Sequence, residues 1–246
     1  MPTGEQGIGA GRGRAAPAGG PHEATPGRFP TADAGAVPWL SVEQMAEADR
    51  LAVDVFGIDL LQMMEHAGSS LAEVVRHVAP AGEIVVLAGG GNNGGGGLCA
   101  ARHLADRGRE ATVVLSTARL GDAAQHHLRT LEEMGIRPAD EPPDVPVVVD
   151  ALVGYGLDGP LRDRAAELAA WGAGRTVVSL DLPSGLGHPG AVVPSATVTL
   201  ALPKSRLEHV RPLWVADLGL PEALWGRIGV EQDALFAEGP IVEIVG

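Results

Sequence analysis

Three polar segments stand directly after apolar runs, where their side chains could do chemistry. Asp150 follows Val147-Val148-Val149, and Asp181 follows Val177-Val178-Ser179-Leu180. The third segment, residues 89–97, reads Gly-Gly-Gly-Asn-Asn-Gly-Gly-Gly-Gly and follows another apolar run. If the runs are parallel strands, their carboxyl ends border one crevice. The sequence therefore predicts that the three segments converge on one site.

Asp181 is the better candidate for proton transfer. Pro183 and Gly185 constrain the turn that follows it, and a carboxylate in a sheltered crevice can have its pKa raised toward a useful range. Helix capping is the alternative role for a single aspartate after a strand. Two aspartates with adjacent glycine turns favour a functional site.

Other side chains near these segments carry oxygen ligands. Asp150, Asn93 and Ser184 supply a carboxylate, an amide and a hydroxyl. Such oxygens suit a hard cation and not zinc or copper. The histidines show no HxH or HExxH spacing, so they are not predicted to bind a metal.

The glycine-rich segment is predicted to be a loop between a strand and a helix. Dense glycine favours a positive φ or a close approach of another group, and a helix N-terminus suits an anion such as phosphate. Gly89 to Gly94 match G-x-G-x-x-G, but the next strand ends at Ser116, where a Rossmann fold has an acid for the ribose. An ordinary NAD-dependent oxidoreductase is therefore disfavoured. No Lys-Ser or Lys-Thr follows the glycines, which excludes a Walker A loop.

Charge and composition exclude several classes of function. The net charge of −13 argues against binding to nucleic acid or to an anionic membrane. No apolar run approaches the roughly 20 residues of a membrane span, and none near the start resembles a signal peptide, so a cytoplasmic location is expected. Cys99 lies in an apolar helical pattern and is predicted to be a core residue. Lys204 is the only lysine, and we attribute this to compositional bias.

The patterns beyond the glycine segment predict an α/β fold with a mostly parallel sheet covered by helices. Residues 1–38 are rich in Gly, Pro and Ala and are predicted to be a disordered tail, with one domain over 39–246. The domain begins with a capping box at Ser41 and Gln44. Helices are predicted at 42–55, 60–78, 98–107, 122–134 and 161–171. Strands are predicted at 84–88, 111–115, 145–149, 176–180, 196–202, 213–216 and 241–245.

Several separated motifs resemble those of the YjeF N-terminal domain family, in the same order. They are Met64-Glu65-His66-Ala67-Gly68, residues 91–97, residues 150–157, Asp181-Leu182-Pro183-Ser184-Gly185 and Thr197-Val198-Thr199-Leu200. The resemblance runs from about Ser41 to Pro221. It implies a Rossmann-like three-layer αβα sandwich.

The family resemblance also implies an activity, the interconversion of the R and S epimers of hydrated NADH and NADPH (NADHX and NADPHX). The chain would then be an isomerase of coenzyme repair, an NAD(P)H-hydrate epimerase. A noncatalytic nucleotide-binding or interaction module of the same fold is the alternative. The sister activity is a dehydratase, which we expect to be encoded separately because the chain ends without one. Members of the family commonly form homodimers.

By position, the resemblance implies roles for individual residues. Asp181 would contact the substrate as the acid or base, and Asn93, Asp150 and Ser184 would hold one potassium ion (K⁺) per subunit. The remaining substrate-binding residues would be Asn92, Asn93, Gly94, Gly95, Gly96, Gly154, Tyr155, Gly156, Leu157, Asp158, Gly159 and Pro160.

Three positions depart from the family pattern. Gly96 stands where the family has Asp, His66 where it frequently has Asn, and Tyr155 where it usually has Thr. Loss of one charge-assisted hydrogen bond at position 96 costs roughly 1.5–3 kcal/mol, or about one to two powers of ten in affinity. Such a loss is compatible with turnover.

Overall fold

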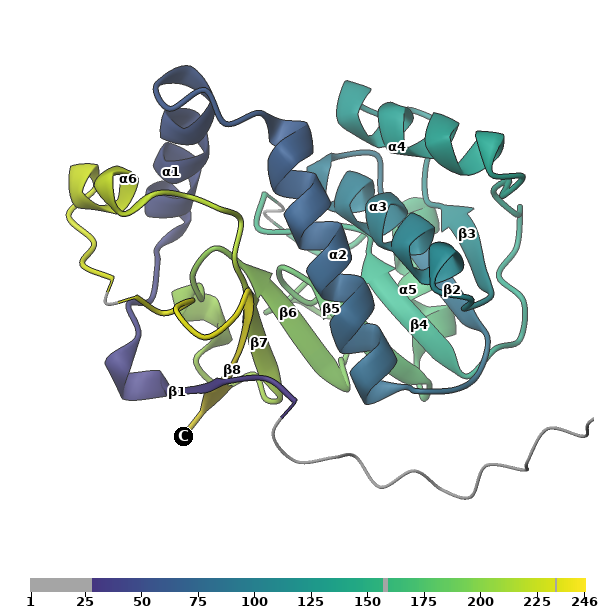
Figure 1. The fold of residues 1–246 in the computed structure, drawn as a ribbon. Helices are drawn as coiled ribbons and strands as arrows, with labels where there is room; N and C mark the ends of the chain where they lie inside the picture. The colour runs from purple at the N-terminus through teal and green to yellow at the C-terminus, as the bar shows by residue number, and fades with distance from the viewer. Residues whose placement is uncertain (1–27, 157–158, 233) are drawn as a thin grey trace, which may run out of the picture.

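An eight-stranded sheet with helices on both faces forms the body of the molecule (Figure 1). The computed structural model describes residues 28–156, 159–232 and 234–246 of the 246-residue chain. The strands are β1 (Thr31–Asp33), β2 (Ile84–Ala88), β3 (Ala111–Leu115), β4 (Val147–Ala151), β5 (Thr176–Leu180), β6 (Ala196–Leu200), β7 (Leu213–Ala216) and β8 (Ile241–Val245). The α-helices are α1 (Val42–Asp54), α2 (Leu60–Val78), α3 (Asn92–Asp106), α4 (Asp122–Glu133), α5 (Asp163–Gly172) and α6 (Glu222–Arg227).

The strand order, β1-β8-β7-β6-β5-β4-β2-β3, explains where a ligand can enter. All pairs are parallel except β7 with β8. After β2 the chain first adds β3 on one side and then β4 on the other, so the winding direction reverses at β2 and β4. In open parallel sheets the ligand crevice lies outside the carboxyl ends of the strands at such a reversal.

Alternate residues of the strands bury opposite faces, which produces three layers. Val147 and Val149 of β4 belong to the core shared with α2, α3 and α4. Val148, between them, packs with Leu168 of α5 on the other side. Strands covered on both faces read as continuous apolar runs, which is why they were predictable. The predicted αβα sandwich is confirmed.

The glycine-rich segment is the first correction. Helix α3 begins at Asn92, so Gly94 to Gly97 lie in its first turns and not in a loop. A Cβ on Gly94 would lie 1.9 Å from the Gly89 carbonyl oxygen, and a Cβ on Gly97 would lie 2.4 Å from the Ala151 Cβ. The close approach that glycine was predicted to permit is therefore made by the protein's own backbone and side chains.

The predicted boundary of the N-terminal tail at residue 38 is also wrong. Residues 31–33 form β1, which pairs with β8, and Phe29 packs edge-on against His77 with ring centroids 5.3 Å apart. A three-residue edge strand is too short to show periodicity, and the Gly/Pro/Ala composition around it conceals it. The prediction for residues 1–27 lies outside the described residues.

Smaller differences concern element ends. Strand β4 runs two residues further than the predicted 145–149, which places Asp150 inside the strand, opposite Leu87 and Ser179 of its neighbours. Strand β6 ends at Leu200, and the short helix α6 was not predicted. Within the described residues, no helix is long and apolar enough to cross a membrane.

Candidate active site

A cavity of about 480 Å³ lies beside the carboxyl ends of β2, β4, β5 and β6, with α1 and α2 on its far side. Most of the predicted substrate residues lie in its wall: Asn92, Asn93, Gly96, Gly154, Tyr155, Gly156 and Asp181. Gly94 and Gly95 are buried in α3, and Gly159 and Pro160 are not part of the wall. The predictions for Leu157 and Asp158 lie outside the described residues.

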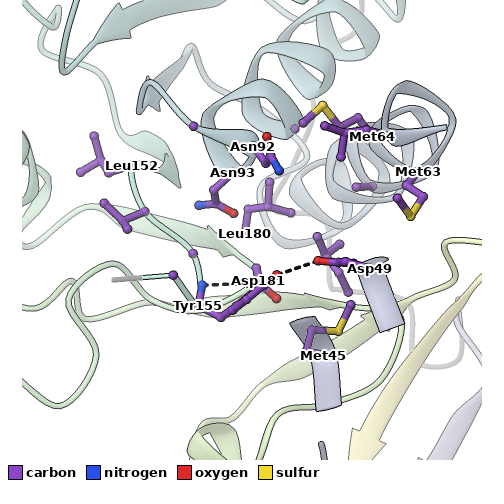
Figure 2. A pocket seen from close by; sticks show the side chains of 18 of the residues that line it. Met45, Asp49, Met63, Met64, Asn92, Asn93, Leu152, Tyr155, Leu180 and Asp181 are labelled. Atoms are coloured by element: carbon purple, nitrogen blue, oxygen red, sulfur yellow. Dashed lines mark hydrogen bonds between the residues drawn. The ribbon is translucent and has the colours of Figure 1, made fainter. Parts of the chain in front are cut away.

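Apolar side chains form the opposite wall. Met45 comes from α1, and Met63 and Met64 come from α2 (Figure 2). Leu60 and Ala67 of α2 add to this surface, and Leu180 at the end of β5 adds an apolar group from the strand side. Methionine is unbranched and polarisable, so it adapts to a flat, partly aromatic ligand. The wall therefore suits a flat ring, and polar groups face it from the strand side, with Asp49 of α1 on the helix side.

Asp181 is buried in the wall of the cavity and held by its backbone and its side chain. It follows β5 directly, is 4% exposed and has a φ of +65°. A left-handed conformation is uncommon for a residue with a side chain; it costs of order 1–3 kcal/mol and persists only where the surroundings enforce it. The Asp181 backbone N–H donates to the Val198 carbonyl at 2.7 Å, and its Oδ2 accepts from the Tyr155 backbone N–H at 3.2 Å.

Lys204 supplies the counter-charge to Asp181. Its Nζ lies 2.7 Å from Asp181 Oδ1 and donates to the Leu200 carbonyl at 2.6 Å. The residue is 1% exposed, which is very rare for lysine without a partner. We attributed this lone lysine to compositional bias and did not predict that it lies in the cavity wall. Its position just after a predicted strand was the available signal.

Tyr155 links Asp181 to a carboxylate that the sequence did not single out. Its hydroxyl donates to Asp49 Oδ2 at 2.6 Å, while its backbone N–H donates to Asp181 (Figure 2). Burial raises the pKa of Asp49, and the nearby Asp181 acts in the same direction. Asp49 lies on α1, far from Asp181 in sequence, so local pattern gave no reason to select it.

Asp150 and Ser184, two of the predicted cation ligands, are hydrogen-bonded to each other. The Ser184 hydroxyl donates to Asp150 Oδ1 at 2.6 Å, and the Ser184 backbone N–H and the Ser179 hydroxyl donate to Oδ2 at 2.9 and 2.8 Å. Burial raises the pKa of the Asp150 carboxyl, and the hydrogen bonds from Ser184 oppose this. The Val153 carbonyl lies 3.1 Å from Ser184 Oγ. A carboxylate, a hydroxyl and a carbonyl therefore gather around one point.

Asn93, the third predicted cation ligand, belongs to the first turn of α3. Its Oδ1 lies 3.2 Å from where a Cβ on Gly154 would stand, and Asp181 Oδ2 lies 3.0 Å from the same point. The Asn93 Nδ2 is buried and has no hydrogen-bond partner among the described residues. The Asn93 amide oxygen and the Asp181 carboxylate therefore both lie close to Gly154.

A second cluster, on α2 and α3, joins Glu65, Cys99 and His103. Its spacing resembles a metal site, but the Arg102 guanidinium contacts all three side chains and supplies the positive charge. Burial raises the pKa of the Cys99 thiol to about 12, so it is not a nucleophile at neutral pH. This agrees with its prediction as a core residue.

The fold and the cavity define a doubly wound α/β protein with its ligand site at the winding reversal. A family model, YjeF-related protein N-terminus, matches residues 60–206. The chain belongs to this family, as its motifs predicted.

Relatives of known name agree over nearly their whole length. An NAD(P)H-hydrate epimerase of Dehalogenimonas lykanthroporepellens is 41% identical, with 83% of this chain and 91% of the relative covered. An NAD(P)H-hydrate epimerase of Truepera radiovictrix is 36% identical, with 84% and 100% covered. The crystal structure of yeast ynu0 superposes with a TM-score of 0.75 at 24% identity, covering 85% of this chain and all of that one. The yeast structure supports the fold alone.

Proposed function

We propose that this protein is an NAD(P)H-hydrate epimerase, an isomerase that interconverts the R and S forms of NADHX and NADPHX. The observation that carries the proposal is the 41% identity to a named epimerase over 91% of that relative. The apolar wall and the Asp181–Lys204 ion pair of the cavity are consistent with it. The noncatalytic alternative rests on Gly96, where a Cβ would meet Leu180 Cδ2 at 2.8 Å and where the family has a carboxylate.

Epimerisation inverts the carbon that bears the hydroxyl group, and this inversion involves proton transfer to and from the substrate. In the hydrated ring, water has added across a carbon–carbon double bond, so the hydroxyl stands on a carbon next to the ring nitrogen. One route to inversion removes the hydroxyl proton, so that a carbonyl forms at that carbon as its bond to the ring nitrogen breaks; this route needs a group that accepts the proton. Asp181 is suited to this role because Lys204 supplies the counter-charge to its carboxylate and the surrounding turn fixes its direction.

We also propose a potassium ion at Asp150, Ser184 and Asn93. The donor set fits by its chemistry, because Asp150, Ser184 and the Val153 carbonyl meet through oxygen atoms, the Asn93 side chain offers one more, and hard cations prefer oxygen. The ion, when bound, would supply positive charge that orders the loops after β4 and β5. Asp150, Ser184 and the Val153 carbonyl would hold it from the strand side.

The metabolic partner would be an NAD(P)HX dehydratase encoded separately. Relatives such as a protein of Salinibacter ruber are named bifunctional NAD(P)H-hydrate repair enzymes, and the match covers 42% of that protein. A homodimer stays a prediction.

The first expected result tests the activity. Purified protein is added to R-NADHX together with an S-specific dehydratase, and NADH is followed by its absorbance. We expect NADH to appear faster than the spontaneous epimerisation rate allows. No acceleration, together with tight binding of an adenine nucleotide, would favour the noncatalytic alternative.

A second expected result tests the cation site without an activity assay. Replacing choline chloride by potassium chloride should raise the thermal midpoint, since a ligand bound only by the folded state stabilises by about 2.7 kcal/mol at one hundred times its Kd. Asp150→Asn should remove the difference between the two salts. The exposed Asp144→Asn is the matched control and should keep it. Equal wild-type midpoints in both salts would contradict the proposed site.

A further inference from the structure

Two carboxylates stand on different walls of the cavity and are joined through one residue. Asp181 follows β5 on the strand side, and Asp49 comes from α1 on the helix side. Tyr155 donates its backbone N–H to the first and its hydroxyl to the second (Figure 2). The long phenolic side chain that carries this hydroxyl is a departure of this chain, because the family usually has the shorter Thr at position 155.

The surroundings of the two carboxylates differ. Asp181 has the Lys204 ammonium at 2.7 Å. Asp49 has no ion pair within the described ranges, and the groups that face it are the Tyr155 hydroxyl, Lys204 and Asp181. Burial and the like charge of Asp181 raise the pKa of Asp49, and the Tyr155 hydrogen bond and Lys204 oppose this. A pair of acids held in such different environments can divide the acid and base roles.

We propose that Asp49 is a second proton-transfer residue of the cavity, acting as the acid while Asp181 acts as the base, and that the Tyr155 hydroxyl positions it. This inference rests on the proposed epimerase function. The Tyr155 bond occupies Oδ2 of Asp49, and no described residue hydrogen-bonds to Oδ1. A proton on Oδ1 is therefore free for a ligand in the cavity.

The proposed step balances within the site. Asp181 accepts the proton of the substrate hydroxyl, and that oxygen forms a carbon–oxygen double bond. The bond between this carbon and the ring nitrogen breaks, and its electron pair goes to the nitrogen, which takes the proton of Asp49. The resulting aldehyde turns about its single bond to the neighbouring carbon. The nitrogen then attacks the other face and both protons return, so no further reactant is needed.

Asp49→Asn and Tyr155→Phe test the proposal. Asp49→Asn should lower kcat by about 10²-fold or more, the usual contribution of a general acid, and should abolish the fall of kcat/KM at high pH. Tyr155→Phe should move that fall to higher pH, because losing the hydrogen bond favours the protonated acid. The Asp49→Asn chain should still unfold cooperatively, because an amide at this half-buried position needs no counter-charge.

Asp54→Asn is the matched control, since Asp54 is exposed on the same helix and pairs with Arg50 at the surface; its kcat and pH profile should equal those of the wild type. Wild-type kcat and pH profile in Asp49→Asn would overturn the proposal, as would an effect on KM alone. Tyr155→Phe is an independent test: an unchanged pH profile of kcat/KM in this variant would overturn the positioning role of the Tyr155 hydroxyl. Absence of epimerisation in the wild type would instead refute the proposed function, so the two failures are distinguishable.

Discussion

An Asp181→Asn variant is expected to lose at least about 10²-fold in kcat, the usual contribution of a positioned acid or base. Asparagine keeps the shape of the side chain and can still accept the Tyr155 N–H, but it cannot take a proton. The loss should appear in kcat and in kcat/KM to a similar extent, because proton transfer is made only in the transition state. The coupled dehydratase assay with R-NADHX measures both.

The same variant leaves Lys204 buried without its counter-charge, so stability must be measured beside activity. Removing one partner of a buried ion pair typically costs about 3–5 kcal/mol. The double variant Asp181→Asn with Lys204→Met removes both charges and should recover much of that loss, measured as the urea midpoint, while remaining inactive. A double variant that is stable and active would reject Asp181 as the proton-transfer group.

The strands of this fold could be predicted because their signal is local. Residues such as Val147 to Val149 are apolar in sequence, and burial on both faces of a parallel sheet is the reason. The same logic placed Asp181 at a strand end and brought Asp150 and Ser184 together, since parallel strands end at one edge. The structure puts the last two in direct hydrogen-bond contact.

Other parts of the site depend on contacts between distant segments. Asp49 precedes Tyr155 by 106 positions, and nothing near it in sequence distinguishes it from an ordinary exposed helix residue. Lys204 can be assigned to the site only once its ion pair with Asp181 is seen, and Asp181 follows a different strand. The start of α3 was missed because glycine is a poor helix former. Tertiary packing compensates, since only glycine lets this helix approach Gly89 and the Ala151 side chain so closely.

Gly94→Ala is therefore expected to lower the free energy of unfolding by at least about 3 kcal/mol, the upper range for an overpacked site. The added Cβ would stand 1.9 Å from the Gly89 carbonyl oxygen and 2.8 Å from the Gly89 backbone nitrogen. Both obstacles are backbone atoms, so a side-chain rotation cannot relieve the clash, and α3 must move off the sheet.

Gly91→Ala is the matched control three residues away. It is the N-cap of α3, has a negative φ, and a Cβ there meets nothing within 4 Å. Alanine is a poorer N-cap than glycine, and with no steric clash this change should cost about 1 kcal/mol, well below the cost of Gly94→Ala. Urea unfolding of both variants under the same conditions measures the difference. Equal urea midpoints would mean that Gly94 is not needed for helix–sheet packing. Close approach of a ligand would then better explain the glycines at the start of α3.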